Sequence, residues 1–115
     1  MPSDTIARLQ KLCNEYGNEL LQEICHIFCD SVNDQIRILE RHLRNGDLSG
    51  IQFSGHKMKS SGANLGLIRF AELCEYFEYM SSEAPEQESV RNLSELKKEY
   101  ELAKEVLKSF WEMAS

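Results

Sequence analysis

The 115-residue sequence has no apolar run near the ~20 residues that a membrane-spanning helix needs. Its first ten residues, MPSDTIARLQ, lack the basic start and the apolar centre of a secretory signal peptide. Proline occurs only twice and hydrophobic residues make up 42% of the chain, which excludes the composition of a disordered or low-complexity segment. We therefore expect one soluble domain over residues 1–115, long enough to bury a single core.

Positive charge is also scarce. The chain has 13 Lys and Arg residues against 19 Asp and Glu residues, and this net charge of −6 argues against sequence-independent binding to nucleic acid or to anionic lipid. Four cysteines lie beside apolar residues at helical spacing: Cys13, Cys25, Cys29 and Cys74. In the absence of a secretory signal, buried reduced thiols are expected rather than disulfides.

Helical periodicity, by contrast, runs along nearly the whole chain. Apolar residues recur every three or four positions in five segments: 3–16, 18–44, 48–65, 70–80 and 85–114. The expected buried row of the first segment is Ile6, Leu9 and Cys13. That of the third segment is Leu48, Ile51, Gly55, Met58, Gly62 and Leu65.

The ends of these segments carry residues that start and stop helices. Ser3 or Asp4 is expected to cap the first helix, and Asp47 the third. Three glycines are placed to end helices: Gly17, Gly46 and Gly66. Four apolar stripes joined by short loops predict an all-α fold, an up-and-down four-helix bundle with a short additional N-terminal helix across one end.

His56 lies on the outward face of the third segment. On a helical wheel of about 100° per residue, it falls roughly 130° from the direction of the buried row. Its surface neighbours are small or polar: Gln52, Lys59, Ser60 and Ala63. Ser49 lies a turn further back, and Phe53 is expected to be exposed on the flank. A small-residue surface beside an exposed aromatic is typical of a docking site.

Lys59 places a positive charge one turn from His56 and could stabilise an anion attached to the imidazole. Nucleophilic catalysis on a peptide bond would need an orienting acid and an oxyanion hole, and neither is apparent in the sequence. A phosphoryl acceptor needs only an exposed ring nitrogen, a nearby cation and room for the donor. The residues around His56 therefore favour a phosphoryl acceptor.

The stretch HKMKSSGANLGLIRFAELCEYFE resembles the signature of the histidine-containing phosphotransfer (HPt) domain of multistep phosphorelays. His56 matches the phosphorylated histidine of that family, Lys59 the lysine after it, and Leu65-Gly66 the following turn. The end of the fourth helix matches through Cys74, Phe77 and Glu78, with Phe where Leu is common. Ser60 departs from the glycine that many members have after the lysine.

The resemblance implies a phosphoryl carrier rather than an enzyme. His56 would accept a phosphoryl group from a receiver-domain aspartate and pass it to another receiver, with Lys59 neutralising phosphate charge. Gln52 falls where members often have a polar residue bonded near the imidazole or its phosphate. The receiver would dock on Ser49, Phe53, Ser60 and Ala63. The chain has no Gly-rich nucleotide loop of its own.

The same resemblance implies where the domain works and with what. Its expected partners are receiver domains and a hybrid sensor kinase, with no nucleic acid and no direct membrane contact. No cofactor is expected on this chain, and magnesium is expected on the receiver. The expected location is the cytoplasm, or the cytoplasmic part of a membrane-bound sensor kinase.

Two other readings of the sequence remain open. Di-iron bundles use paired Glu-x-x-His motifs, but Glu23 to His26 is the only such spacing. Cys25 and Cys29 could suggest zinc, although His26 lies about 100° around the helix from Cys25. A non-catalytic helical interaction adaptor would explain the heptads and the acidity, but not the small-residue face around His56. His26 and His42 are expected to be ordinary surface residues.

Overall fold

The computed structural model describes residues 2–114, which form helices and no strand, so the all-α prediction is confirmed. Residues 1 and 115 of the expected single domain lie outside this range. Five helices follow one another in the described chain: α1 Pro2–Tyr16, α2 Asn18–Asn45, α3 Leu48–Asn64, α4 Ile68–Glu78 and α5 Glu86–Ala114. No helix among the described residues is long and apolar enough to cross a bilayer.

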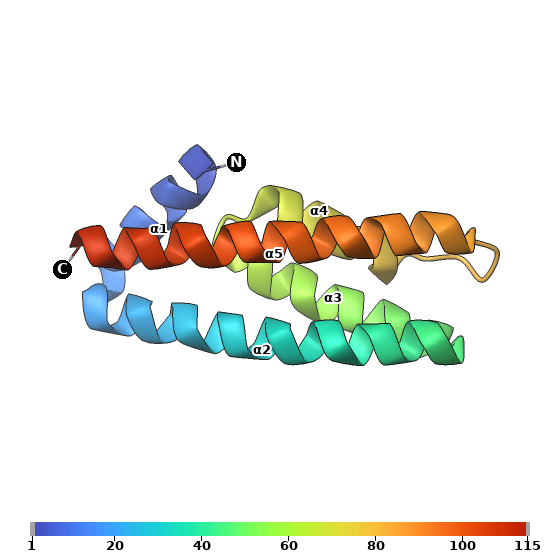
Figure 1. The fold of residues 1–115 in the computed structure, drawn as a ribbon. Helices are drawn as coiled ribbons and strands as arrows, with labels where there is room; N and C mark the ends of the chain where they lie inside the picture. The colour runs from blue at the N-terminus through green and yellow to red at the C-terminus, as the bar shows by residue number, and fades with distance from the viewer. Residues whose placement is uncertain (1, 115) are drawn as a thin grey trace.

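Helices α2 to α5 run alternately up and down the long axis of a molecule measuring 46 × 21 × 18 Å (Figure 1). α3 packs against both α2 and α4, and α5 packs against α2 and α4. α1 lies at the end where α2 begins and α5 finishes, as the sequence predicts for the additional helix. The four stripes are unequal, however, because α4 has only 11 residues.

The predicted helix stops are confirmed. Gly17, Gly46 and Gly66 adopt positive φ angles of 88°, 67° and 74°, a conformation that side chains with a Cβ rarely tolerate. Asp47 caps α3 as expected, since its Oδ1 accepts a hydrogen bond of 3.1 Å from the Gly50 amide. The expected cap at Ser3 or Asp4 is wrong, because α1 already begins at Pro2, a residue suited to a first helical turn.

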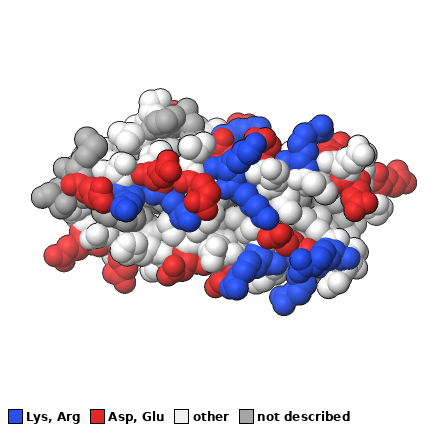
Figure 2. Space-filling model, in the orientation of Figure 1, with Lys and Arg blue, Asp and Glu red and all other residues white. Residues whose placement is uncertain are grey.

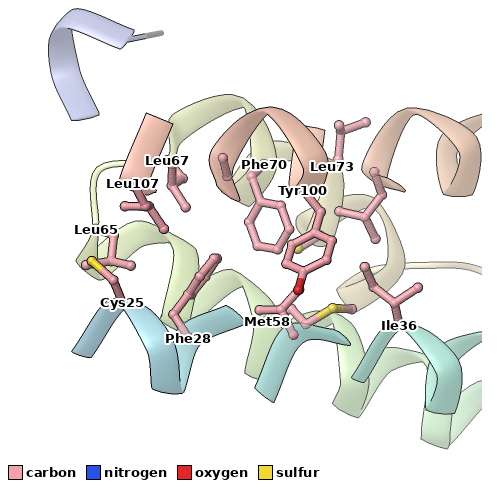
Figure 3. Packing of buried hydrophobic residues seen from close by; sticks show 14 of the residues in the cluster. Cys25, Phe28, Ile36, Met58, Leu65, Leu67, Phe70, Leu73, Tyr100 and Leu107 are labelled. Carbon is pink, nitrogen blue, oxygen red and sulfur yellow. The ribbon is translucent and has the colours of Figure 1, made fainter. Parts of the chain in front are cut away.

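Side chains from every helix form one hydrophobic core, part of which is drawn in Figure 3. Phe28 of α2 and Phe70 of α4 meet edge to face, with ring centroids 5.7 Å apart. Tyr100 of α5 is buried, and its hydroxyl donates a 2.7 Å hydrogen bond to the Cys29 carbonyl. Burying a side chain such as Phe70 contributes about 1.5–3 kcal/mol to folding.

The buried row expected for α1 needs one correction. Ile6 is 42% exposed, and its neighbour Thr5 is fully buried instead. The Thr5 hydroxyl donates a 2.9 Å hydrogen bond to the Gly66 carbonyl, which satisfies the buried polar group. Leu9 is buried as predicted. α1 is therefore docked on the turn between α3 and α4 by one hydroxyl as well as by apolar side chains.

All four cysteines are free thiols, as predicted. Cys25 and Cys74 are buried, whereas Cys13 and Cys29 are only half-buried, contrary to the expectation for these two. Burial, helped by the neighbouring Cys29, raises the pKa of Cys25 to about 12. Burial also raises the pKa of Cys74. Thiols in such surroundings stay protonated and unreactive at neutral pH.

Candidate functional site

His56 projects from the middle of α3, on the side opposite the residues that α3 buries. Its side chain is 63% exposed, as the helical wheel predicts. Directly before it, Gly55 is buried against α4, and a Cβ added there would lie 2.5 Å from the Glu78 amide nitrogen and 2.7 Å from the Cys74 carbonyl oxygen. The missing side chain thus lets the two backbones approach closely, and the approach brings the end of α4 beside the imidazole.

Glu78, the last residue of α4, joins His56 to Lys59. One carboxylate oxygen, Oε2, is hydrogen bonded to Nδ1 of His56. The other, Oε1, accepts a 2.7 Å hydrogen bond from Nζ of Lys59. In a neutral imidazole that donates from Nδ1, the lone pair is on Nε2, so a carboxylate at Nδ1 favours the tautomer in which Nε2 is unprotonated.

The pKa shifts of Glu78 and Lys59 are consistent with these two hydrogen bonds. The hydrogen bond from Lys59, followed by that from His56, lowers the pKa of Glu78 and keeps its carboxylate ionised. In return, the hydrogen bond to Glu78 raises the pKa of Lys59. Lys59 also lies 3.6 Å from a Glu75 carboxylate oxygen and 5.3 Å from the centroid of the Tyr79 ring. The site therefore holds an ionised carboxylate against Nδ1 of an exposed imidazole.

The family model described as Hpt domain matches residues 23–106 of the chain. The chain belongs to the Hpt domain family. This Hpt domain is a histidine phosphotransfer module of phosphorelays, and its family consists of phosphotransfer carriers that interact with receiver domains and are not kinases.

Among solved structures, the Hpt domain is similar to histidine-containing phosphotransfer protein B from Pseudomonas aeruginosa, with a TM-score of 0.83 and 18% sequence identity. The likeness covers 93% of this chain and 92% of that one, a larger share of the chain than residues 23–106 matched by the family model. At this identity the likeness shows the fold. No curated protein sequence matches the chain.

The residues expected to dock a receiver all lie at the surface of α3. Phe53 is 66% exposed. The remaining three are exposed too: Ser49, Ser60 and Ala63. The structure thus places the predicted docking residues and His56 together on the solvent-facing side of one helix.

Gln52 does not bond to His56 in this structure. Its amide Nε2 donates a 2.9 Å hydrogen bond to the Met80 carbonyl, just beyond the end of α4. The expected bond between Gln52 and the imidazole is therefore not made here, because an unpaired carbonyl at the end of a helix competes for the amide. A contact between Gln52 and a phosphoryl group stays a prediction.

Glu78 is the residue of this candidate site that reasoning from the sequence did not assign. The sequence shows no obvious orienting acid for His56, yet Glu78 takes that position from 22 residues away. Two signals pointed to it: Gly55 in the buried row of α3, and the position of Glu78 four residues after the buried Cys74 on α4. Combining them requires knowing that α3 and α4 touch at Gly55.

The other two histidines lie apart from this site on α2. His26 is exposed, as expected. His42 is not an ordinary surface residue: its side chain is 26% exposed, and its Nδ1 lies 3.2 Å from Asp47 Oδ2. Its ring fills the space beside Gly50, where an added Cβ would lie 2.5 Å from Nδ1. No group of three potential metal ligands comes together within residues 2–114.

Proposed function

We propose that His56 is the phosphorylated residue of this Hpt domain and that Nε2 is the accepting atom. The single observation that supports this is the exposed imidazole whose Nδ1 is bonded to Glu78. Nε2 attacks the phosphorus of a receiver's aspartyl phosphate, the P–O bond to the aspartate breaks, and the carboxylate leaves. The ring keeps its Nδ1 proton and becomes cationic, and the Glu78 carboxylate stabilises that charge. Transfer onto a second receiver is the reverse reaction.

Lys59 neutralises part of the phosphate charge in this proposal. In the unphosphorylated protein, Nζ of Lys59 lies 2.7 Å from Oε1 of Glu78 and 3.6 Å from Oε2 of Glu75. The longer contact involves a carboxylate that is 56% exposed, so breaking it costs little. Lys59 can then turn toward a phosphoryl group on Nε2 while the shorter contact still holds Glu78.

The receiver docks on the small-residue face around His56 in the same proposal. Phe53 supplies an exposed aromatic anchor, and Ser60 and Ala63 leave room for an incoming active site. The receiver supplies the magnesium ion, which neutralises phosphoryl oxygens during transfer. Partners of this kind place the domain in the cytoplasm, either alone or as part of a hybrid sensor kinase.

The test is phosphate uptake from a phosphorylated receiver domain by the His56→Gln variant. We expect uptake to be abolished with the fold unchanged, because residue 56 is exposed and contributes little to packing. The wild-type product should be acid-labile and base-stable, as a phosphohistidine is. His26→Gln, which changes another exposed histidine, is the matched control and should load normally. Normal loading of His56→Gln would refute the assignment, and binding of receivers without any transfer would favour the helical adaptor.

A further inference from the structure

A groove opens at the end of the bundle opposite α1. α4 stops at Glu78 while α2 and α5 extend further, and residues 79–85 cross to α5 as a loop (Figure 1). At this end the fourth helix of the bundle is missing, so apolar side chains of α2, α3 and α5 are covered only by the loop. They surround a cavity of about 420 Å³, here named the α2–α5 groove. That volume is within the range of small-molecule sites.

The groove is lined mainly by apolar side chains: Leu43, Leu48, Ile51, Met80, Val90 and Leu93. Ile51 at its base is only 3% exposed, whereas Val90 at its rim is 61% exposed. The other side chains of this set are half-buried, so each presents apolar surface to the groove. Covering that surface with an aliphatic chain would remove it from water, which is favourable.

The charge on the α2 side of the groove is positive. Arg44 lines the groove and forms no ion pair with any described residue. Glu40, which also lines it, is already bound to Lys97 at 3.0 Å. Basic side chains gather over the C-terminal half of α2, at the lower right of Figure 2. On the opposite side Glu86 is negative, so an anion is favoured only beside Arg44.

We propose that the α2–α5 groove is a binding site for an amphipathic carboxylate of low molecular weight. Its aliphatic chain lies against Leu43, Ile51 and Leu93, and its carboxylate pairs with the guanidinium of Arg44, which suits a planar two-oxygen anion. None of the phosphotransfer residues His56, Lys59 and Glu78 lines this groove. Binding here can therefore be measured on its own, apart from phosphate uptake.

The test is a titration of the whole protein with decanoate below its micellar concentration, followed by NMR. We expect saturable shifts of the backbone amides of Leu43, Met80 and Leu93. Decylamine, which has the same chain and the opposite charge, should bind more weakly, and acetate should not bind because it has no chain to bury. The Arg44→Gln variant should bind decanoate two- to fivefold more weakly, as expected for an ion pair at a solvent-exposed rim.

Arg37→Gln is the matched control, since it removes the same charge from the same exposed face of α2 two turns away. It should bind decanoate as the wild type does. The proposal is wrong if decylamine binds as tightly as decanoate, or if Arg44→Gln and Arg37→Gln behave alike. It is also wrong if the shifts occur instead in a different cavity, which Ile24 and Ile27 line on the N-terminal half of α2.

Discussion

At the scale of single residues, the carboxylate of Glu78 contacts both other polar members of the site. One of its oxygens is hydrogen bonded to Nδ1 of His56, and the other accepts a hydrogen bond from the Lys59 ammonium. Lys59 keeps the pKa of Glu78 low, and in the proposed transfer the resulting anion stabilises the positive ring. Lys59 therefore acts on the imidazole indirectly, because it keeps the carboxylate bonded to His56 ionised before any phosphoryl group is bound.

Glu78→Gln tests this arrangement. The amide oxygen can still accept from Nδ1, but it cannot balance the charge of a phosphorylated ring, and a hydrogen bond to an ionised acceptor is about twice as strong as a neutral one. We expect the rate of phosphate uptake to fall about tenfold, equivalent to about 1.4 kcal/mol. Ring ¹⁵N shifts of His56 should show a mixture of tautomers. Glu75→Gln, at a more exposed carboxylate of the same helix, should change neither quantity appreciably.

The same carboxylate makes stability depend on pH. Because contacts with Lys59 and then His56 lower the pKa of Glu78 below the ordinary 4.5, the folded state binds its proton more weakly than the unfolded state does. The contribution is therefore fully present above the ordinary carboxyl pKa and is lost as pH falls through the lowered one. The free energies of urea unfolding of wild type and Glu78→Gln should differ at pH 7 and converge as pH falls from 4.5 through the lowered pKa of Glu78. A difference that stays constant down to acid pH would contradict the linkage.

At the scale of elements, the contact of α3 with α4 positions the site. Gly55 permits the close approach, and the hydrogen bond from Gln52 to the Met80 carbonyl holds the chain just beyond α4. Both contacts lie within one turn of His56 along α3. The geometry of the imidazole and its carboxylate is thus set by how two helices pack, and a change in that packing should alter chemistry as well as stability.

Gly55→Ala should separate α3 from α4. The added methyl group would lie 2.5 Å from the Glu78 amide nitrogen, and backbone atoms cannot rotate away as a side chain can. We expect a loss of about 1–3 kcal/mol in the free energy of unfolding, typical of overpacking. The bond between Glu78 and His56 should weaken, and the rate of phosphate uptake should fall in the folded protein. Lys98→Gly, at a 69% exposed position of α5, lowers helix stability away from the site and should leave the rate of phosphate uptake unchanged.

At the scale of the whole molecule, the bundle was predictable from periodicity, because amphipathic helices must bury their apolar rows against one another. The exposure of His56 was predictable for the same reason. Contacts between polar groups could not be predicted from periodicity. Thr5 replaces Ile6 inside because its hydroxyl reaches the Gly66 carbonyl, and Glu78 reaches His56 across 22 residues. Such pairings depend on where helices end and how closely they approach, which the period of a sequence does not encode.

The last consequence concerns α1, which lies before the residues matched by the family model and covers one end of the bundle. Leu9 is completely buried there, whereas Ile6 is 42% exposed. Leu9→Ala should lower the free energy of unfolding by about 2–5 kcal/mol through the cavity it leaves, and Ile6→Ala by less than about 0.5 kcal/mol. Phosphate uptake, measured well below the melting temperature, should be unchanged in both variants, because α1 makes no contact with His56, Lys59 or Glu78 among the described interactions. If Leu9→Ala slowed uptake without unfolding the protein, the end of the bundle at α1 would be coupled to the phosphotransfer site.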